Sequence, residues 1–310
     1  MIIVTGTVAY DYIMEFPGSF GDHILPDQTH NINLSFIVDR FAKRPGGTAG
    51  NVSYTLGLLS TPHTLFTVAG KDFAEYKEYF EKIGIEMKNV IIDKKKYTAT
   101  GFAMTDNSNN QIWGYYYGAA EDIPSLKLKS IAKKNDLVVI GPQGAEGSMS
   151  MIRQAIKIGS SYMFDPGFIL TQISDEELKI GLTHASYVIG NDYEIKLIQS
   201  RVKSWSELNK KTIVITTLGE KGAIIDQNGK TIQIAPVNVQ KIVSTTGAGD
   251  AWRGGFLAGL DRGYDLKTCG QMGSVAASFA VGHYGTQEHF YTKKDFQDRY
   301  RQTFNSLIKL

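Results

Sequence analysis

The sequence has little cysteine, little imbalance of charge and no long hydrophobic run. Its one cysteine, Cys269, excludes an internal disulfide, and a metal site built on several cysteines is excluded with it. Lys plus Arg (33) nearly balance Asp plus Glu (31), so the net charge of +2 favours neither a nucleic acid nor an anionic membrane as partner. No segment reaches the ~18 successive apolar residues of a membrane span, and the N-terminus lacks a signal-peptide pattern. We expect a cytoplasmic protein without nucleic-acid or membrane partners.

Two kinds of segment alternate along most of the chain. Short apolar runs rich in β-branched residues are bounded by Gly, Asp or Asn, and stretches with helical period lie between them. The runs are 2–4, 65–68, 137–140, 162–164, 187–189 and 213–216, and the helical stretches include 73–83, 148–158 and 193–199. Strands that are apolar on successive residues are typical of a parallel sheet covered on both faces. The pattern predicts an α/β fold with a mostly parallel central sheet flanked by helices.

Two regions depart from this alternation. Segments 97–105 and 111–117 are strand-like and are separated by turn-favouring residues, which predicts an antiparallel hairpin. The region 12–40 is irregular and contains an extended stretch at 31–36. Because an isolated ribbon is marginally stable in water, we expect both regions to pair into one small sheet. The prediction is a single domain, 1–310, with a lid formed discontinuously by about 12–41 and 97–118.

The most specific motif runs from Ser244 to Trp252 and contains Gly247-Ala248-Gly249-Asp250. We expect Thr246 to cap a helix whose free first-turn amides attract an anion such as phosphate. A carboxylate beside a bound phosphate adds repulsion unless it has a chemical task, and Asp250 could take a proton from an attacking hydroxyl. The alternative is a capped helix with an acid in its first turn. No Walker A loop is present, since no Gly-Lys-Ser/Thr follows.

A second glycine pair precedes another helix. Gly46 and Gly47 allow close contact between the backbone and a ligand, and Asn51, about one turn further on, can donate to and accept from hydroxyls. Asp11 follows the first strand, and ligands of open parallel sheets bind beyond the carboxyl ends of strands. The alternatives are a tight strand-to-helix connection and an ordinary loop acid.

Two further segments follow predicted strands. Asn191 and Glu194 have the spacing of a capping box, and they could instead orient the water ligands of Mg²⁺ near phosphates. Thr216 and Gly219 begin a segment that offers hydroxyls and a flexible backbone to a nucleotide, or that is simply a turn.

Taken together and in this order, the motifs resemble the ribokinase-like (PfkB) family of sugar and nucleoside kinases, over essentially the whole chain. The resemblance implies a three-layer α/β sandwich with a small β-sheet lid, and ATP and Mg²⁺ as cofactors. The roles it implies are a base at Asp250, an anion hole at Gly247, Ala248 and Gly249, substrate contacts at Asp11, Gly46, Gly47 and Asn51, ATP contacts at Thr216, Gly219 and Asn191, and magnesium contacts at Glu194 and, through water, Asn191.

The sequence departs from the family pattern at two places. Ser244 stands where the family often has Asp, and Asp165-Pro166 lacks the Arg often found just after it, so Asp165 receives no role.

Gly6 to Met14, Asn33 to Phe36 and Gly285 to Gln287 look like an adenosine-kinase-type branch of the family. Aromatic residues of the lid could stack on a purine, pack the small sheet or meet a partner in a homodimer; they are Phe36, Phe102, Trp113, Tyr115, Tyr116 and Tyr117. The leading hypothesis is phosphorylation of the 5′-hydroxyl of a purine nucleoside, adenosine first. A sugar kinase for ribose or fructose and a non-catalytic nucleotide sensor are the alternatives.

Overall fold

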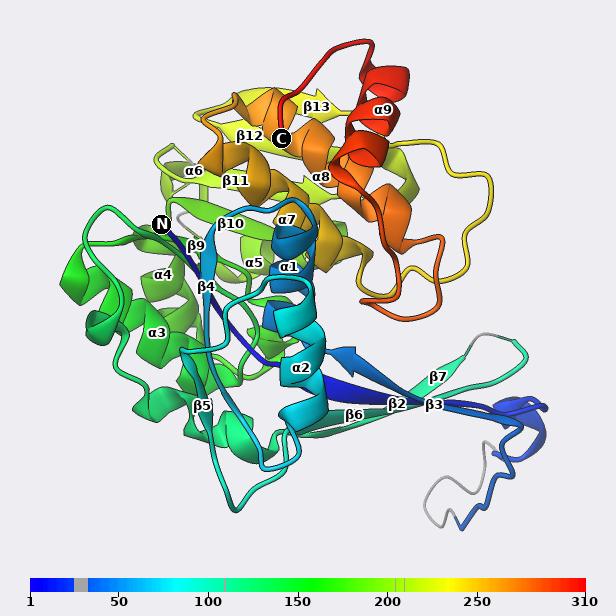
Figure 1. Ribbon diagram of the computed structural model, residues 1–310. Coiled ribbons are helices and arrows are strands. Elements are labelled where there is room, and N and C mark those ends of the chain that lie inside the picture. The colour runs from blue at the N-terminus through cyan, green and yellow to red at the C-terminus, as the bar shows by residue number, and fades with distance from the viewer. Residues whose placement is uncertain (25–32, 109, 204, 209) are drawn as a thin grey trace.

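A nine-stranded sheet forms the centre of the protein (Figure 1). The structure is a computed structural model, and it describes residues 1–24, 33–108, 110–203, 205–208 and 210–310. The strand order is β13-β12-β11-β10-β9-β8-β1-β4-β5. The strands are β1 (Ile2–Thr5), β4 (His63–Ala69), β5 (Val90–Ile92), β8 (Leu137–Ile140), β9 (Ser161–Phe164), β10 (Tyr187–Asn191), β11 (Ile213–Thr217), β12 (Ala223–Gln227) and β13 (Lys230–Ile234). From β11 to β5 all neighbours are parallel, and β12 and β13 are antiparallel to their neighbours. The mostly parallel sheet is confirmed.

The continuous apolar runs of the sequence have a direct structural cause. In β1, Ile2 and Val4 belong to one hydrophobic core while Ile3, between them, belongs to another. Successive side chains of a strand point to opposite faces, so a strand covered on both faces needs apolar residues at every position. In β8, Val139 and Ile140 divide between the two cores in the same way.

Helices cover the two faces of this sheet. One core receives side chains from α1 (Thr48–Leu58), α2 (Ala74–Lys82), α7 (Ala248–Asp261), α8 (Leu266–Ala280) and α9 (Lys293–Phe304). The other receives them from α3 (Ala145–Ile158), α4 (Asp175–Thr183) and α5 (Asp192–Arg201), and the short α6 (Trp205–Leu208) packs at its margin. Among the described helices, none has both the length and the apolar character needed to cross a membrane. The expected three-layer sandwich is confirmed.

A separate four-stranded sheet projects from this body (Figure 1). Its order is β3-β2-β6-β7, and the strands are β2 (Ala9–Glu15), β3 (Arg40–Gly46), β6 (Ala99–Thr105) and β7 (Gln111–Tyr116). The predicted hairpin is the antiparallel pair β6 and β7. Strand β2 lies between β3, which is antiparallel to it, and β6, which is parallel.

The described part of the expected extended stretch, residues 33–36, does not supply a strand of this sheet. Residues 31 and 32 lie outside the described chain, and 33–36 have no regular structure. Phe36 instead packs its ring against Phe16 and Phe20, with centroids 4.7 and 5.4 Å away. The strand that pairs with β2 is 40–46, and it ends at the glycines that precede α1. The small sheet therefore includes 9–11 and 42–46, beyond the segments expected for a lid.

Candidate functional site

The N-terminus of α7 is formed by glycine, and not by the threonine that the sequence suggested. Gly247 is the N-cap with φ +80°, a left-handed conformation that glycine adopts without strain. A Cβ atom at this position would lie 2.7 Å from Cγ2 of Thr286. Thr246 lies outside the helix, where its amide donates to Oγ of Ser244 at 3.2 Å. The close approach of the Thr286 segment thus selects glycine at the helix tip.

Asp250 is the third residue of α7, and its carboxylate is largely buried, with 17% of the side chain exposed. Asn51, in the first turn of α1, donates from Nδ2 to Oδ2 of Asp250 at 2.8 Å. Burial raises the pKa of Asp250, while the charge of Arg253 and the hydrogen bond from Asn51 lower it. Two motifs that are 199 residues apart in sequence therefore meet at one carboxylate.

Asp11 follows β1, and it lies on β2 within the small sheet; the alternative of a loop acid does not apply. Its neighbours across the sheet are Gly101 on β6 and Arg44 on β3. A Cβ atom at Gly46 would lie 2.1 Å from Oδ2 of Asp11, and one at Gly101 would lie 2.9 Å from Oδ1. Burial, and then the charge of Asp250, raise the pKa of Asp11 to about 6. The glycines make room for a carboxylate that faces Asp250.

A small hollow of about 40 Å³ lies between the small sheet and the body. It is lined on one side by strands of the small sheet and on the other by the segments before α7 and after α8. The lining residues are Asp11, Ile13, Arg44, Ala103, Gln111, Trp113, Ser244, Thr246, Tyr284, Gly285 and Thr286. The lining includes Asp11 and also Ser244 and Thr246, which precede the N-terminus of α7. A small molecule in the hollow would therefore lie close to Asp11 and to the start of α7.

The predicted nucleotide-contacting residues lie at neighbouring strand ends. Thr216 on β11 pairs in register with Gly190 on β10, and Gly219 begins the turn after β11 with φ +59°. Asn191 and Glu194 form a complete capping box at the start of α5, with hydrogen bonds of 2.7 and 2.8 Å. The charge of Glu194 also raises the pKa of Asp250, so its carboxylate shares the electrostatic environment of the site.

Glu194 and Asn191 are the residues at which we predicted magnesium contacts. Within the described residues, no group of three or more His, Cys, Asp or Glu side chains is arranged to hold a metal ion. Mg²⁺ often binds one or two carboxylates and completes its shell with water and substrate phosphates. The side chains of Glu194 and Asn191 each accept one backbone hydrogen bond in the capping box, and the second carboxylate oxygen of Glu194 takes no part in it.

Sequence reasoning missed an ion pair at the site. Arg253, one turn after Asp250, and Asp165, directly after β9, are both buried and form an ion pair at 2.6 Å. The sequence contained the Asp-Pro segment, but nothing in it indicated that Arg253 would be its partner.

Gln287 was noted only as part of the resemblance, and the structure gives it two contacts. Its Nε2 donates to Oδ1 of Asn51 at 2.8 Å and to the hydroxyl of Tyr76 at 2.7 Å. These bonds fix which end of the Asn51 amide faces Asp250.

The aromatic residues of the small sheet divide between its two faces. Tyr115 lies opposite Gly101 and hence on the same face as Asp11, and Trp113 shares that face. The ring of Tyr115 stacks on Trp113, with centroids 5.4 Å apart, and on Phe168 of the body, 5.9 Å apart. Phe102 and Tyr116 point to the opposite face. We call Trp113, Tyr115 and Phe168 the aromatic stack.

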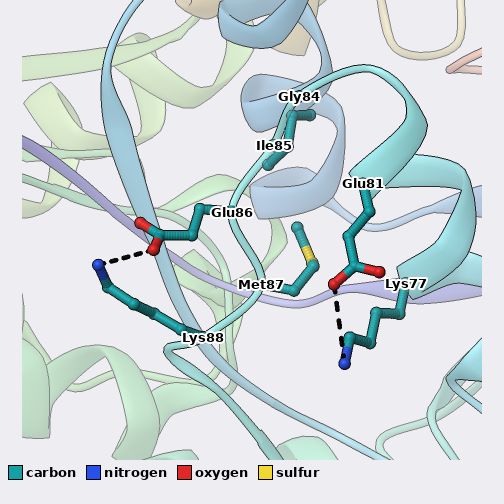
Figure 2. Close-up of a pocket in the computed structure, with 7 residues that line it drawn as sticks. All are labelled: Lys77, Glu81, Gly84, Ile85, Glu86, Met87 and Lys88. Atoms are coloured by element: carbon teal, nitrogen blue, oxygen red, sulfur yellow. Dashed lines mark ion pairs between the residues drawn. The ribbon is translucent and has the colours of Figure 1, made fainter.

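A second hollow, of about 460 Å³, lies at the end of α2 and the segment after it (Figure 2). Figure 2 shows its charged side chains pairing with each other, Lys77 with Glu81 at 3.7 Å and Lys88 with Glu86 at 2.7 Å. These pairs are solvent-exposed, and exposed ion pairs contribute little energy. The hollow has no residue in common with the predicted site.

Replacing Asp11 with Asn should stabilise the folded protein at about pH 8. The pKa of Asp11 is raised from 3.8 to about 6, so the folded chain binds this proton more tightly than the unfolded chain. Wild-type stability therefore falls as pH rises between these values. We expect Asp11→Asn to gain roughly 1–2 kcal/mol in free energy of unfolding at about pH 8, and almost nothing at about pH 4, in urea titrations. A less stable variant at about pH 8 would contradict a desolvated carboxylate.

Three comparisons with known proteins show which family the chain belongs to. The family model described as pfkB family carbohydrate kinase matches residues 9–293. A nucleoside kinase of Methanothermobacter thermautotrophicus is 31% identical over 293 residues, which cover 92% of this chain and 91% of the relative. The structure of Burkholderia thailandensis nucleoside kinase in complex with inosine is similar with a TM-score of 0.90, at 31% identity and with 100% of both chains covered. The chain belongs to the pfkB family of carbohydrate kinases and is a phosphotransferase that acts on a hydroxyl group.

Proposed function

We propose that this protein transfers the γ-phosphate of ATP to the 5′-hydroxyl of a purine nucleoside, with adenosine as the first candidate acceptor. The observation that carries the proposal is the convergence of Asp11, Asn51 and Asp250 beside the tip of α7. The Methanothermobacter relative and the Burkholderia structure are nucleoside kinases, and the latter has been solved with ADP and inosine.

In this proposal Asp250 is the general base. Its carboxylate accepts the proton of the 5′-hydroxyl as the hydroxyl oxygen attacks the γ-phosphorus, and the bond to the β-phosphate oxygen breaks. The backbone of Gly247, Ala248 and Gly249 at the tip of α7 places amides and the positive end of the helix dipole beside the transferred phosphoryl group. Because burial raises the pKa of Asp250, the carboxylate is a stronger base than an exposed Asp.

The ribose hydroxyls would be held by the acids and amides around the hollow. Asp11 can accept two hydrogen bonds, and Asn51 can both donate and accept. Gly46 and Gly47 lie at the end of β3 and at the start of α1, where the absence of side chains leaves the backbone accessible. These contacts would orient the 5′-hydroxyl toward Asp250.

ATP would lie across the carboxyl ends of β10 and β11. Asn191, Thr216 and Gly219 belong to these strands and the turn after them. Glu194 would meet the water shell of Mg²⁺, and the metal, when bound with ATP, neutralises phosphate charge. Closure of the small sheet as a lid would exclude water from the transferred phosphate.

The aromatic stack supports a nucleoside over a free sugar. Position 101 lies next to Asp11, and a Cβ atom there would lie within 3.5 Å of the rings of Trp113 and Tyr115. Phe168 adds a ring from the body. A purine attached to a ribose held by Asp11 would reach these rings, and such stacking typically contributes ~1–3 kcal/mol.

Asp250→Asn should lower kcat by about 10²- to 10⁴-fold, because the amide cannot accept the hydroxyl proton. The shape of the side chain is retained, so ATP should still raise the melting temperature as it does for the wild type. Asp261→Asn, at the exposed end of the same helix, serves as the matched control and should keep wild-type turnover. Near-normal kcat in the Asp250 variant would remove the base from this mechanism.

Tyr115→Ala should raise KM for adenosine roughly tenfold by removing a stacking surface. Tyr116→Ala is the matched control, since it removes a neighbouring ring from the opposite face. Steady-state kinetics with adenosine, inosine, guanosine, ribose and fructose give KM for each variant. The same data give kcat/KM of the wild type for each acceptor. Equal effects of the two substitutions, or a higher kcat/KM for ribose or fructose than for every nucleoside, would exclude the nucleoside proposal.

The outer face of the small sheet is the surface we propose for a homodimer. Phe41, Phe102 and Ile112 are 64%, 46% and 47% exposed there, and Tyr12 stacks between the first two. An apolar sheet face of this kind is often covered by another chain. We expect a dimer in analytical ultracentrifugation, and Phe102→Glu should shift it to a monomer. A monomeric wild type at concentrations of tens of micromolar, as a rough guide, would rule this out.

A further inference from the structure

A buried arginine lies one turn after the proposed base. Arg253 is 8% exposed, and a buried charge is costly unless it is paired. Two of its three nitrogens approach the carboxylate of Asp165, which is 2% exposed. Nε lies 2.6 Å from Oδ2 as an ion pair, and Nη2 donates a hydrogen bond to Oδ1 at 2.9 Å. Only the Nη2 contact has the geometry of a hydrogen bond, and together the two contacts restrain the orientation of the guanidinium.

The third nitrogen faces the proposed base. Nη1 of Arg253 lies 3.9 Å from Oδ1 of Asp250, longer than a direct hydrogen bond. A Cβ atom at Gly249 would lie 2.7 Å from Nη1, so glycine at this position leaves room for the guanidinium. The charge of Arg253 therefore lies beside Gly249, near the N-terminus of α7. It is close to Asp250 but forms no direct hydrogen bond with it.

Among the described residues, the other charged groups coupled to Asp250 are carboxylates, and Arg44, which lines the hollow, pairs with Glu288 at 3.3 Å. Glu194 on α5 faces it, Asp165 follows β9, and Asp11 lies on β2 across the hollow. The neutral groups facing it are Asn51 on α1 and the buried hydroxyl of Tyr76 on α2. Burial is the largest influence raising the pKa of Asp250, Glu194 adds to it, and Arg253 is the largest opposing influence.

We propose that Arg253, clamped by Asp165, is a positioning residue that keeps Asp250 ionised and yet free to accept a proton. The contact with Asp165 contributes to this role as well as the charge of Arg253, because it keeps the guanidinium from forming a direct salt bridge with Asp250. An arginine that closed on Asp250 in a full salt bridge would make the carboxylate a weaker base, and no arginine at all would leave a buried acid protonated. The inference rests on the proposed role of Asp250 as the base.

The test is the pH dependence of kcat/KM for adenosine at saturating Mg-ATP, from about pH 5 to about pH 9, in folded variants. We call the fall of kcat/KM at low pH the acidic limb. Arg253→Gln should raise the midpoint of the acidic limb by roughly 1 pH unit or more, because an opposite charge at this distance lowers a carboxylate pKa by about 1–3 units. Arg253→Lys keeps the charge without the fork and should shift the limb less. Asp165→Asn should move the limb in the opposite direction, because the released guanidinium can close on Asp250.

Arg262→Gln is the matched control. Arg262 is a partly buried arginine at the end of the same helix, and it donates to Leu59 and Thr61. Its loss should lower the melting temperature without moving the limb. If Arg253→Gln does not fold, Asp165→Asn and Arg253→Lys still test the opposite shifts.

Two failures can be told apart. In the first case, Asp250→Asn abolishes turnover, but the acidic limbs of the Arg253 and Asp165 variants stay at the wild-type pH or shift in the same direction. The positioning role of Arg253 is then wrong, and Asp250 remains the proposed base. If Asp250→Asn keeps turnover, the base itself is wrong, whatever these variants do.

Discussion

The hydrogen bond from Asn51 to Asp250 joins the starts of two helices, and the rest of the site depends on it. The amide of Asn51 is oriented by Gln287, which also donates to the hydroxyl of Tyr76. Tyr76 in turn donates to the carbonyl oxygen of Gly46 at the end of β3, at 2.9 Å. One buried chain of hydrogen bonds therefore connects the small sheet to the proposed base.

The same site concentrates negative charge in a partly desolvated space. The pKa of Asp11 and that of Asp165 are each raised to about 6, and burial is the main cause at both. Such acids lower the stability of the ligand-free protein near neutral pH, and sites with perturbed acids are often functional for that reason. Arg253 offsets part of the repulsion. The arrangement is therefore consistent with a site that gains its stability when a polyhydroxylated substrate and a nucleotide are bound.

The fold could be predicted because local patterns and global environment agree. Apolar runs such as 137–140 need burial on both faces, and only a covered parallel sheet supplies it. The hairpin of β6 and β7 was predicted because turn-favouring residues separate its strands. Strand β3 was missed because its charged, partly exposed sequence, with a proline, has weak strand propensity. Its pairing with β2 decides its conformation, and pairing between segments some 30 residues apart leaves no local signal.

The sequence by itself determined the types of group at the site: glycines before two helices, the amide of Asn51 and the carboxylates of Asp11 and Asp250. Their chemistry restricts what they can do. Only the tertiary structure decided which groups meet. It brought Arg253 to Asp165 across 88 residues, placed Tyr115 on the sheet face of Asp11 and Tyr116 on the opposite face, and selected Gly247 over Thr246 as the helix cap. The physical reason is that distances between segments, strand register and burial arise from the packing of the whole chain.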